Sequence, residues 1–174
     1  MPLSLQNERL RLRQYSFDDA ARIAQLCADF SLKGFFLPDE SPNSIEQANL
    51  YISRAIQENE NNNQIVYGIE LIKHHGIIGE IRINVVDKTL SYWLGAEFRG
   101  QGYTVDAIEL ITYYGYSQLN FQKIDAYVDR QNIASRKILE IAGFRFQSIY
   151  IDYTHTIRRQ MTFLMYTHFR PEQH

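Results

Sequence analysis

The sequence has a single cysteine, Cys27, and no apolar run of membrane-spanning length. One cysteine excludes an intrachain disulfide and fits a reducing compartment. Without a long apolar run there is no candidate membrane span, and the N-terminus lacks the basic and apolar pattern of a secretory signal. We therefore expect a cytoplasmic protein that does not work in a membrane.

Neither sign of charge dominates the chain, since 18 Lys and Arg stand against 20 Asp and Glu. A nucleic-acid-binding protein usually carries a strong basic excess, so we expect no nucleic-acid partner. The histidines at 74, 75 and 155 fall in expected loops or turns without metal-ligand spacing, and we expect no metal site. Cys27 lies on the apolar face of an expected helix, which favours a core residue over a nucleophile.

The chain instead offers enough apolar material for one compact core. It has 174 residues, of which 45% are hydrophobic and 13% aromatic. This length suits a single domain spanning residues 1–174 and is short for two. No internal repeat or low-complexity linker divides it.

Hydrophobic periodicity predicts a mixed α/β, or α+β, order of elements. Alternating or β-branched segments predict strands over 8–14, 64–73, 77–86, 90–94, 124–129, 144–151 and 158–166. Helical spacing predicts helices over 18–30, 44–59, 104–119 and 132–142. Residues 33–43 read as a loop, 58–63 as a solvated loop that ends the second helix, and 73–76 as a hairpin turn.

The most informative segment is Arg99-Gly100-Gln101-Gly102-Tyr103-Thr104, between an expected strand and an amphipathic helix. Two glycines allow positive φ and close approach of a ligand, and the free amides of a helix start attract anions. Arg99 would add a charge-assisted contact. An ordinary glycine turn into a helix is the alternative, and the segment has neither a Walker lysine nor a third dinucleotide-binding glycine.

Four ordered motifs resemble the GNAT superfamily of N-acetyltransferases, and within it the branch that acetylates ribosomal-protein N-termini (on alanine or serine). The first resembles the family's (Gln/Arg)-x-x-Gly-x-(Gly/Ala) pyrophosphate loop. The others are an opening strand at 8–13, the segment Ser91-Tyr92-Trp93-Leu94, and Asn132-x-x-Ser135 followed by Gly143-Phe144. The chain departs from the family at Ser91, where glycine is usual, at Thr104, where a small residue is usual, and at Leu139.

The resemblance implies a GNAT-type fold: a central, mostly antiparallel sheet of about seven strands, flanked by four helices, with splayed fourth and fifth strands. It implies acetyl-CoA as co-substrate and a primary amine as acceptor: a protein N-terminus, a polyamine or a small-molecule amine. The amine would attack directly within a ternary complex. Exposed aromatics permit a homodimer. The implied cofactor-binding residues are Trp93, Leu94, Gly95, Arg99, Gly100, Gln101, Gly102, Tyr103, Thr104, Asn132 and Ser135.

The chemistry needs an oxyanion donor, an acid and a base. A backbone N–H near residues 93–95 would bind the oxyanion. Many family members place an acidic Tyr seven residues after the Asn, where this chain has Leu139, so Ser135 becomes the candidate donor to the leaving thiolate. Glu80 is the candidate base, although a solvent-facing strand position is the reading we favour; Asp129 is a second candidate.

Several readings stay open at this stage. Trp93 either walls the acyl pocket or packs in the core, and Asn132 caps a helix whether or not it contacts a ligand. The departures at positions 91, 104 and 139 also suit a non-catalytic acyl-CoA-binding module. A nucleotide-binding enzyme that uses the same glycine loop is a third possibility.

Overall fold

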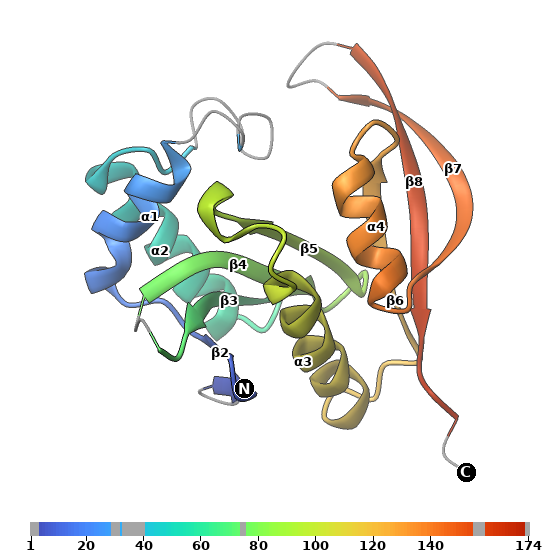
Figure 1. Cartoon of the computed structure of the whole chain (residues 1–174), viewed down its shortest axis with the longest axis horizontal. Coiled ribbons are helices and arrows are strands. Elements are labelled where there is room, and N and C mark those ends of the chain that lie inside the picture. The colour runs from blue at the N-terminus through green and yellow to red at the C-terminus, as the bar shows by residue number, and fades with distance from the viewer. Residues whose placement is uncertain (1–3, 29–31, 33–40, 74–75, 155–158, 173–174) are drawn as a thin grey trace.

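One sheet of eight strands forms the centre of the molecule (Figure 1). The computed structural model describes residues 4–28, 32, 41–73, 76–154 and 159–172. The strands are β1 (Ser4–Gln6), β2 (Leu10–Arg13), β3 (Gln64–Leu71), β4 (Gly76–Asn84), β5 (Thr89–Leu94), β6 (Lys123–Asp129), β7 (Arg145–Thr154) and β8 (Arg159–Phe169). Their spatial order is β1-β2-β3-β4-β5-β6-β8-β7, and all neighbours are antiparallel except β5 and β6.

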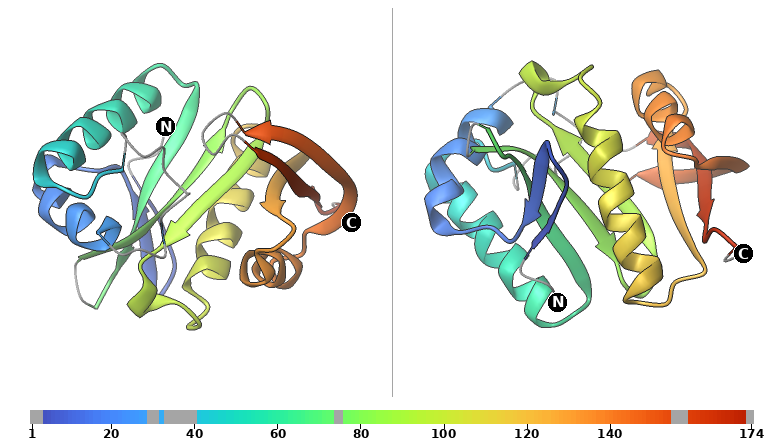
Figure 2. Two further views of the ribbon diagram at one scale, coloured as in Figure 1. Left: turned by 90° about the horizontal axis from the view of Figure 1, so that it is seen from above. Right: turned by 60° about the horizontal axis from the view of Figure 1, so that its bottom comes forward.

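Helices cover both faces of this sheet (Figure 2). They are α1 (Ala20–Cys27), α2 (Ile45–Glu60), α3 (Tyr103–Ser117) and α4 (Ile133–Ile141), with short 3₁₀ turns at Phe17–Asp19 and Ala96–Phe98. Helices α1 and α2 pack together on β3 and β4, whereas α3 packs on β1, β2 and β4 and contacts α4. None of the helices in the described residues is both long and apolar enough to cross a membrane.

The predicted α+β fold with four helices and a mostly antiparallel sheet is confirmed. The sheet has eight strands instead of about seven, because Leu5 and its neighbours pair with β2 opposite Leu12. This three-residue strand is too short to show a period. Strands β3 and β4 pair across the predicted hairpin, from Leu71 opposite Gly76 onward, while the turn residues at 74–75 lie outside the described residues. Residues 33–40 of the loop predicted over 33–43, and residue 155, also lie outside them.

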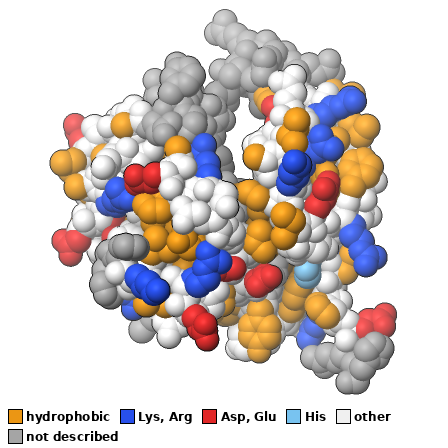
Figure 3. Space-filling model, in the orientation of Figure 1, with side chains coloured by type: hydrophobic (Ala, Val, Ile, Leu, Met, Phe, Trp, Pro, Cys, Tyr) orange, Lys and Arg blue, Asp and Glu red, His pale blue; other side chains and the backbone are white. Residues whose placement is uncertain are grey.

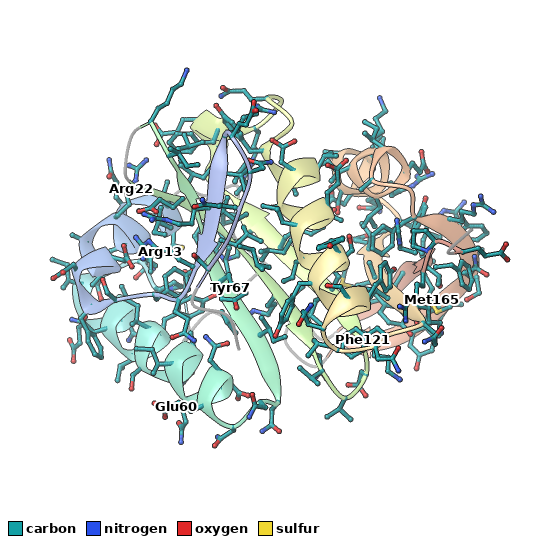
Figure 4. All side chains as sticks on the ribbon, turned by 90° about the horizontal axis from the view of Figure 1, so that it is seen from below. Arg13, Arg22, Glu60, Tyr67, Phe121 and Met165 are labelled. Carbon is teal, nitrogen blue, oxygen red and sulfur yellow. The ribbon has the colours of Figure 1, made fainter. Side chains whose placement is uncertain are left out.

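The two core layers follow from the alternation of side chains along the central strands. One layer, between the sheet and α3, contains Tyr67, Ile81 and Ile108, all fully buried, and side chains fill this space (Figure 4). The other lies under α1 and α2 and contains Cys27 and Trp93. Burial raises the pKa of the Cys27 thiol to about 12, which suits the predicted core role and not a nucleophile.

A local side-chain cap fixes the start of α2. Ser44 accepts a hydrogen bond from the N–H of Gln47 and starts α2. The predicted solvated loop at the end of α2 is confirmed for residues 60–63, which are exposed. Asn59 differs, because it is 4% exposed and its amide pairs with both backbone groups of Val66, at 2.8 and 2.9 Å. Asn59 therefore ties the end of α2 to β3.

Candidate active site

Strands β5 and β6 separate soon after they meet, as predicted for the fourth and fifth strands. They pair in parallel at two positions, Thr89 with Asp125 and Leu90 with Ala126. From Ser91 to Leu94, β5 keeps its pairing with β4 but has moved away from β6. The result is a cleft between β5 and the β6–α4 unit, and Figure 3 shows a notch in the surface on this side with Lys and Arg side chains at both walls.

The edge of β5 that faces the cleft carries the backbone groups of Leu94. The N–H of Gly95 donates to the carbonyl of Ile78 at 2.9 Å, so Gly95 faces β4. Backbone groups alternate in direction along an antiparallel strand, and the N–H and C=O of Leu94 therefore point away from β4, toward the cleft. Of the three candidate oxyanion donors at 93–95, Leu94 is therefore the one whose N–H points toward the cleft.

The phosphate loop (residues 99–104) leads from this edge into α3. Gly100 and Gly102 have φ of +74° and +81°, a left-handed conformation that side chains rarely adopt. Residues 99–102 are exposed, and α3 begins at Tyr103 without a side-chain cap, so the amides of its first turn are free of intrahelical partners. Thr104 is 6% exposed, and its branched side chain lies inside the fold, away from the open side of the loop.

Arg99 connects the phosphate loop to β5. Its Nε donates to the carbonyl oxygen of Leu94 at 2.9 Å, and the residue is exposed. The guanidinium thus stands at the junction of the cleft and the loop. This position is the one from which a cation can reach an anion seated on the amides of the α3 N-terminus.

Helix α4 forms the opposite wall and begins with the predicted cap. The Oδ1 of Asn132 accepts from the N–H of Ser135 at 3.0 Å, and Gly143 ends the helix at φ +86°. The Oγ of Ser135 lies 2.8 Å from the hydroxyl of Tyr92 on β5. Burial raises the pKa of Tyr92 to about 12, although its bond to Ser135 acts in the opposite direction. The sequence placed Tyr92 in a motif without giving it this role.

Glu80 does not face solvent, and the reading that we favoured from the sequence is wrong. The residue is 1% exposed on the α1–α2 face of the sheet. Its carboxylate accepts hydrogen bonds from Tyr15 (3.0 Å), Tyr51 (2.5 Å) and the Nε of Arg82 (2.7 Å). We call these four residues the Glu80 cluster. A buried carboxylate is retained in a fold when donors of this kind surround it.

The two tyrosines of the Glu80 cluster remain protonated. Their pKa values are raised well above the usual range, first by burial and then by the negative charge of Glu80. Trp93, opposite Glu80 in the β4–β5 register and 3% exposed, borders the same region and packs in the core layer under α1 and α2. The sequence signal for the cluster was the spacing of Glu80 and Arg82, which places both on one face of β4.

Asp129 serves a local turn. Its Oδ1 accepts from the N–H of Gln131 at 2.9 Å, and its carbonyl accepts from the N–H of Asn132 at 2.8 Å. Leu139, which stands where many family members have tyrosine, is 1% exposed in the core. Across the described ranges, His, Cys, Asp and Glu form no group of three or more that could hold a metal ion.

The chain is similar to known proteins in sequence and in fold. Residues 9–145 match the family model described as "Acetyltransferase (GNAT) domain". The "Uncharacterized N-acetyltransferase p20" of Bacillus licheniformis is 26% identical over 161 residues, which cover 86% of both chains. A putative ribosomal-protein-serine acetyltransferase from Vibrio cholerae superposes with a TM-score of 0.83 at 17% identity, covering 96% of this chain and 97% of the other.

A second solved structure of the same fold holds a ligand. The Microcin C7 self immunity acetyltransferase MccE, in complex with acetyl-CoA and AMP, superposes with a TM-score of 0.82 at 20% identity. The alignment covers 94% of each chain. At these identities the solved structures establish the shared fold alone.

Proposed function

Because this chain belongs to the GNAT acetyltransferase family, we propose that it moves an acetyl group from acetyl-CoA to a primary amine by direct attack within a ternary complex. The acceptor is a protein N-terminus, a polyamine or a small-molecule amine. The observation that carries the proposal is the phosphate loop. Two exposed, left-handed glycines lead into the start of α3, whose first amides lack intrahelical partners, directly after the β5 edge that faces the cleft.

In this proposal the cofactor lies along the cleft. Its diphosphate binds the amides of residues 100–104 with help from Arg99, and its pantetheine runs beside the edge of β5 at residues 93–95. Asn132 and Ser135 contact it from α4. Two exposed cations, Arg130 shortly before α4 and Lys137 in the middle of it, add positive charge to this part of the chain, which favours an anionic ligand.

The thioester carbonyl would then lie near Leu94. Attack by a neutral amine places a negative charge on the carbonyl oxygen, and the N–H of Leu94 donates to that oxygen. Collapse of the tetrahedral species breaks the carbon–sulfur bond, and Ser135 donates a hydrogen bond to the departing thiolate. Ser135 keeps its own proton in a hydroxyl, so the final proton on sulfur comes from the solvent or from the amine.

Glu80 is the proposed proton acceptor, and it acts through Tyr51. The carboxylate is buried, whereas Tyr51 is half-buried and donates to it at 2.5 Å. As the ammonium of the acceptor gives its proton to the Tyr51 oxygen, Tyr51 passes its own proton to Glu80. The high pKa of Tyr51 requires the two transfers to be concerted, because a free tyrosinate beside Glu80 is unfavourable.

The test is release of coenzyme A thiol from acetyl-CoA in the presence of a panel of amines: a peptide with a free N-terminus, a polyamine and small primary amines. We expect amine-dependent thiol release with at least one class. Tight acetyl-CoA binding without any release would identify a non-catalytic acyl-CoA-binding module, a function that the buried Leu139 in place of tyrosine also suits. Thermal shifts with ATP or NAD but not with coenzyme A would indicate a nucleotide-binding enzyme.

A further inference from the structure

Asp106 places a negative charge beside the helix end that the proposed cofactor needs. It lies in the first turn of α3, within four residues of Gly102, and its side chain is 19% exposed. A carboxylate is favourable at a free helix N-terminus, but it repels a diphosphate bound at the same place. Without a positive partner, Asp106 would therefore weaken diphosphate binding at the site that the glycines form.

Arg9 reaches this carboxylate from the opposite end of the sequence. Its Nη1 lies 2.9 Å from the Oδ2 of Asp106, and its guanidinium carbon lies 4.6 Å from the centroid of the Tyr103 ring. The residue stands directly before β2, a strand on which α3 packs. Two contacts to the first turn of α3, one ionic and one with an aromatic face, hold the side chain in place.

A third contact fixes the phosphate loop itself. The Nη2 of Arg9 donates to the carbonyl oxygen of Gln101 at 2.5 Å, across 92 residues of sequence. In a trans peptide the C=O and the following N–H point in opposite directions. Because Arg9 holds the Gln101 carbonyl, the N–H of Gly102 is turned away from Arg9, toward the open side of the loop.

We propose that Arg9 is a positioning residue of the cofactor site, which cancels the charge of Asp106 and turns the N–H of Gly102 toward the diphosphate. The inference rests on the proposed use of acetyl-CoA, but it concerns binding alone. It adds a residue outside the 99–104 segment to the phosphate seat and explains how an acidic residue is tolerated in the first turn of an anion-binding helix.

The test compares Arg9→Gln, Asp106→Asn and the double variant by calorimetric titration with coenzyme A. We expect Arg9→Gln to raise the Kd about tenfold, the effect of losing one charge-assisted contact. In the double variant, the logarithm of the Kd should return about halfway to its original value. The repulsive charge at position 106 is then gone, but Arg9 no longer fixes the peptide between Gln101 and Gly102. Turnover of S-acetylpantetheine, which lacks the diphosphate, should differ less than twofold between these variants and the unaltered protein.

Arg11→Gln is the matched control. Arg11 is similarly exposed and ion-paired, but its partner is Glu70 on β3, away from the phosphate loop. A Kd for Arg9→Gln within twofold of the unaltered protein, a loss that Asp106→Asn leaves unrepaired, or an equal loss with S-acetylpantetheine would each overturn the proposal. Absence of acetyl transfer in a protein that binds coenzyme A would overturn the proposed function and leave this inference standing.

Discussion

The hydroxyl of Tyr92 lies 2.8 Å from the Oγ of Ser135, and the contact joins β5 to α4 across the cleft. Burial keeps the phenol protonated, because its pKa is raised to about 12. When the Tyr92 hydroxyl donates a hydrogen bond to the Oγ of Ser135, the serine's own hydrogen is free to point at another acceptor. In the proposed reaction that acceptor is the sulfur of coenzyme A.

Replacing Ser135 by alanine should lower kcat about tenfold to a hundredfold, with a small change in KM for acetyl-CoA, because the lost donor acts on the charge that develops at sulfur. Tyr92→Phe should lower kcat by a smaller factor, since the serine remains but is no longer oriented. The double variant should be no slower than Ser135→Ala alone. Steady-state kinetics on all three variants measures this, and additive losses would contradict a shared role.

The Glu80 cluster should contribute to stability as well as to chemistry. Glu80→Gln leaves the guanidinium of Arg82 without its carboxylate partner, and breaking a buried ion pair on one side costs about 3 kcal/mol. Urea unfolding of the variant should show a lower midpoint. Glu60→Gln, an exposed change at the end of α2, is the control and should alter stability by less than about 0.5 kcal/mol. Equal midpoints for the two variants would refute a structural role for Glu80.

The proposed proton-accepting role of Glu80 leads to a separate prediction. Tyr51→Phe interrupts the path from the acceptor to Glu80 while leaving the Glu80–Arg82 pair in place. We expect kcat to fall about tenfold or more, the usual scale of a lost proton-transfer group, with cofactor affinity unchanged. The pH–rate profile of the variant should also change, because the acceptor can no longer pass its proton to Glu80 through Tyr51. An unchanged profile would show that the proton leaves by another route.

His168 should make the fold less stable in mild acid. Burial lowers its pKa, and its Nδ1 lies 2.7 Å from the hydroxyl of Tyr116. In the unfolded chain the ring titrates at about 6.5, so below that pH the unfolded state takes up a proton that the folded state resists. The contribution of the neutral His168 ring to the free energy of unfolding is therefore fully present above about pH 7.5 and is lost as the pH falls. Unfolding free energies of the unaltered protein and His168→Gln, measured from pH 8 to 5, should diverge in slope below pH 6.5; parallel curves would contradict this.

The left-handed glycines of the phosphate loop should tolerate asparagine better than alanine. Gly102 has φ +81°, where an alanine costs about 1–2 kcal/mol and asparagine less. We expect Gly102→Ala to raise the Kd for coenzyme A about tenfold and Gly102→Asn to raise it less. Gly100→Ala tests the backbone alone, because an added Cβ there meets nothing within 4 Å. Equal affinities for all variants would show that loop geometry does not limit binding.

Features determined by neighbouring residues could be predicted from the sequence. The Asn132 cap, the Gly143 stop and the Ser44 start of α2 each depend on backbone groups within a few positions, so the residue type and spacing suffice. The phosphate loop belongs to this class, since two glycines before an amphipathic helix specify its conformation. The splay of the two strands came from family resemblance, because no local pattern encodes it.

Features that join distant segments could not be predicted in this way. Strand alternation indicates the face of β4 on which Glu80 lies, but it does not show that Tyr15 and Tyr51 arrive over that face from the first helical layer. A charged residue in an apolar strand therefore reads as solvent-facing until its partners are seen. The same holds for Arg9, whose carbonyl partner is 92 residues away.

The sheet also has a mechanical property that follows from its shortest ladder. Strands β1–β5 and strands β6–β8 are joined through two residue pairs at the base of the cleft, and elsewhere by helix packing and by the contact between Tyr92 and Ser135. A small rotation of one group of strands about these two residue pairs changes the width of the cleft at its open end far more than at its base. A molecule bonded to both walls of the cleft would restrain that rotation. The amide hydrogens of residues 91–94 should then exchange more slowly with solvent. Occupancy of the site and rigidity of the whole sheet would therefore rise together.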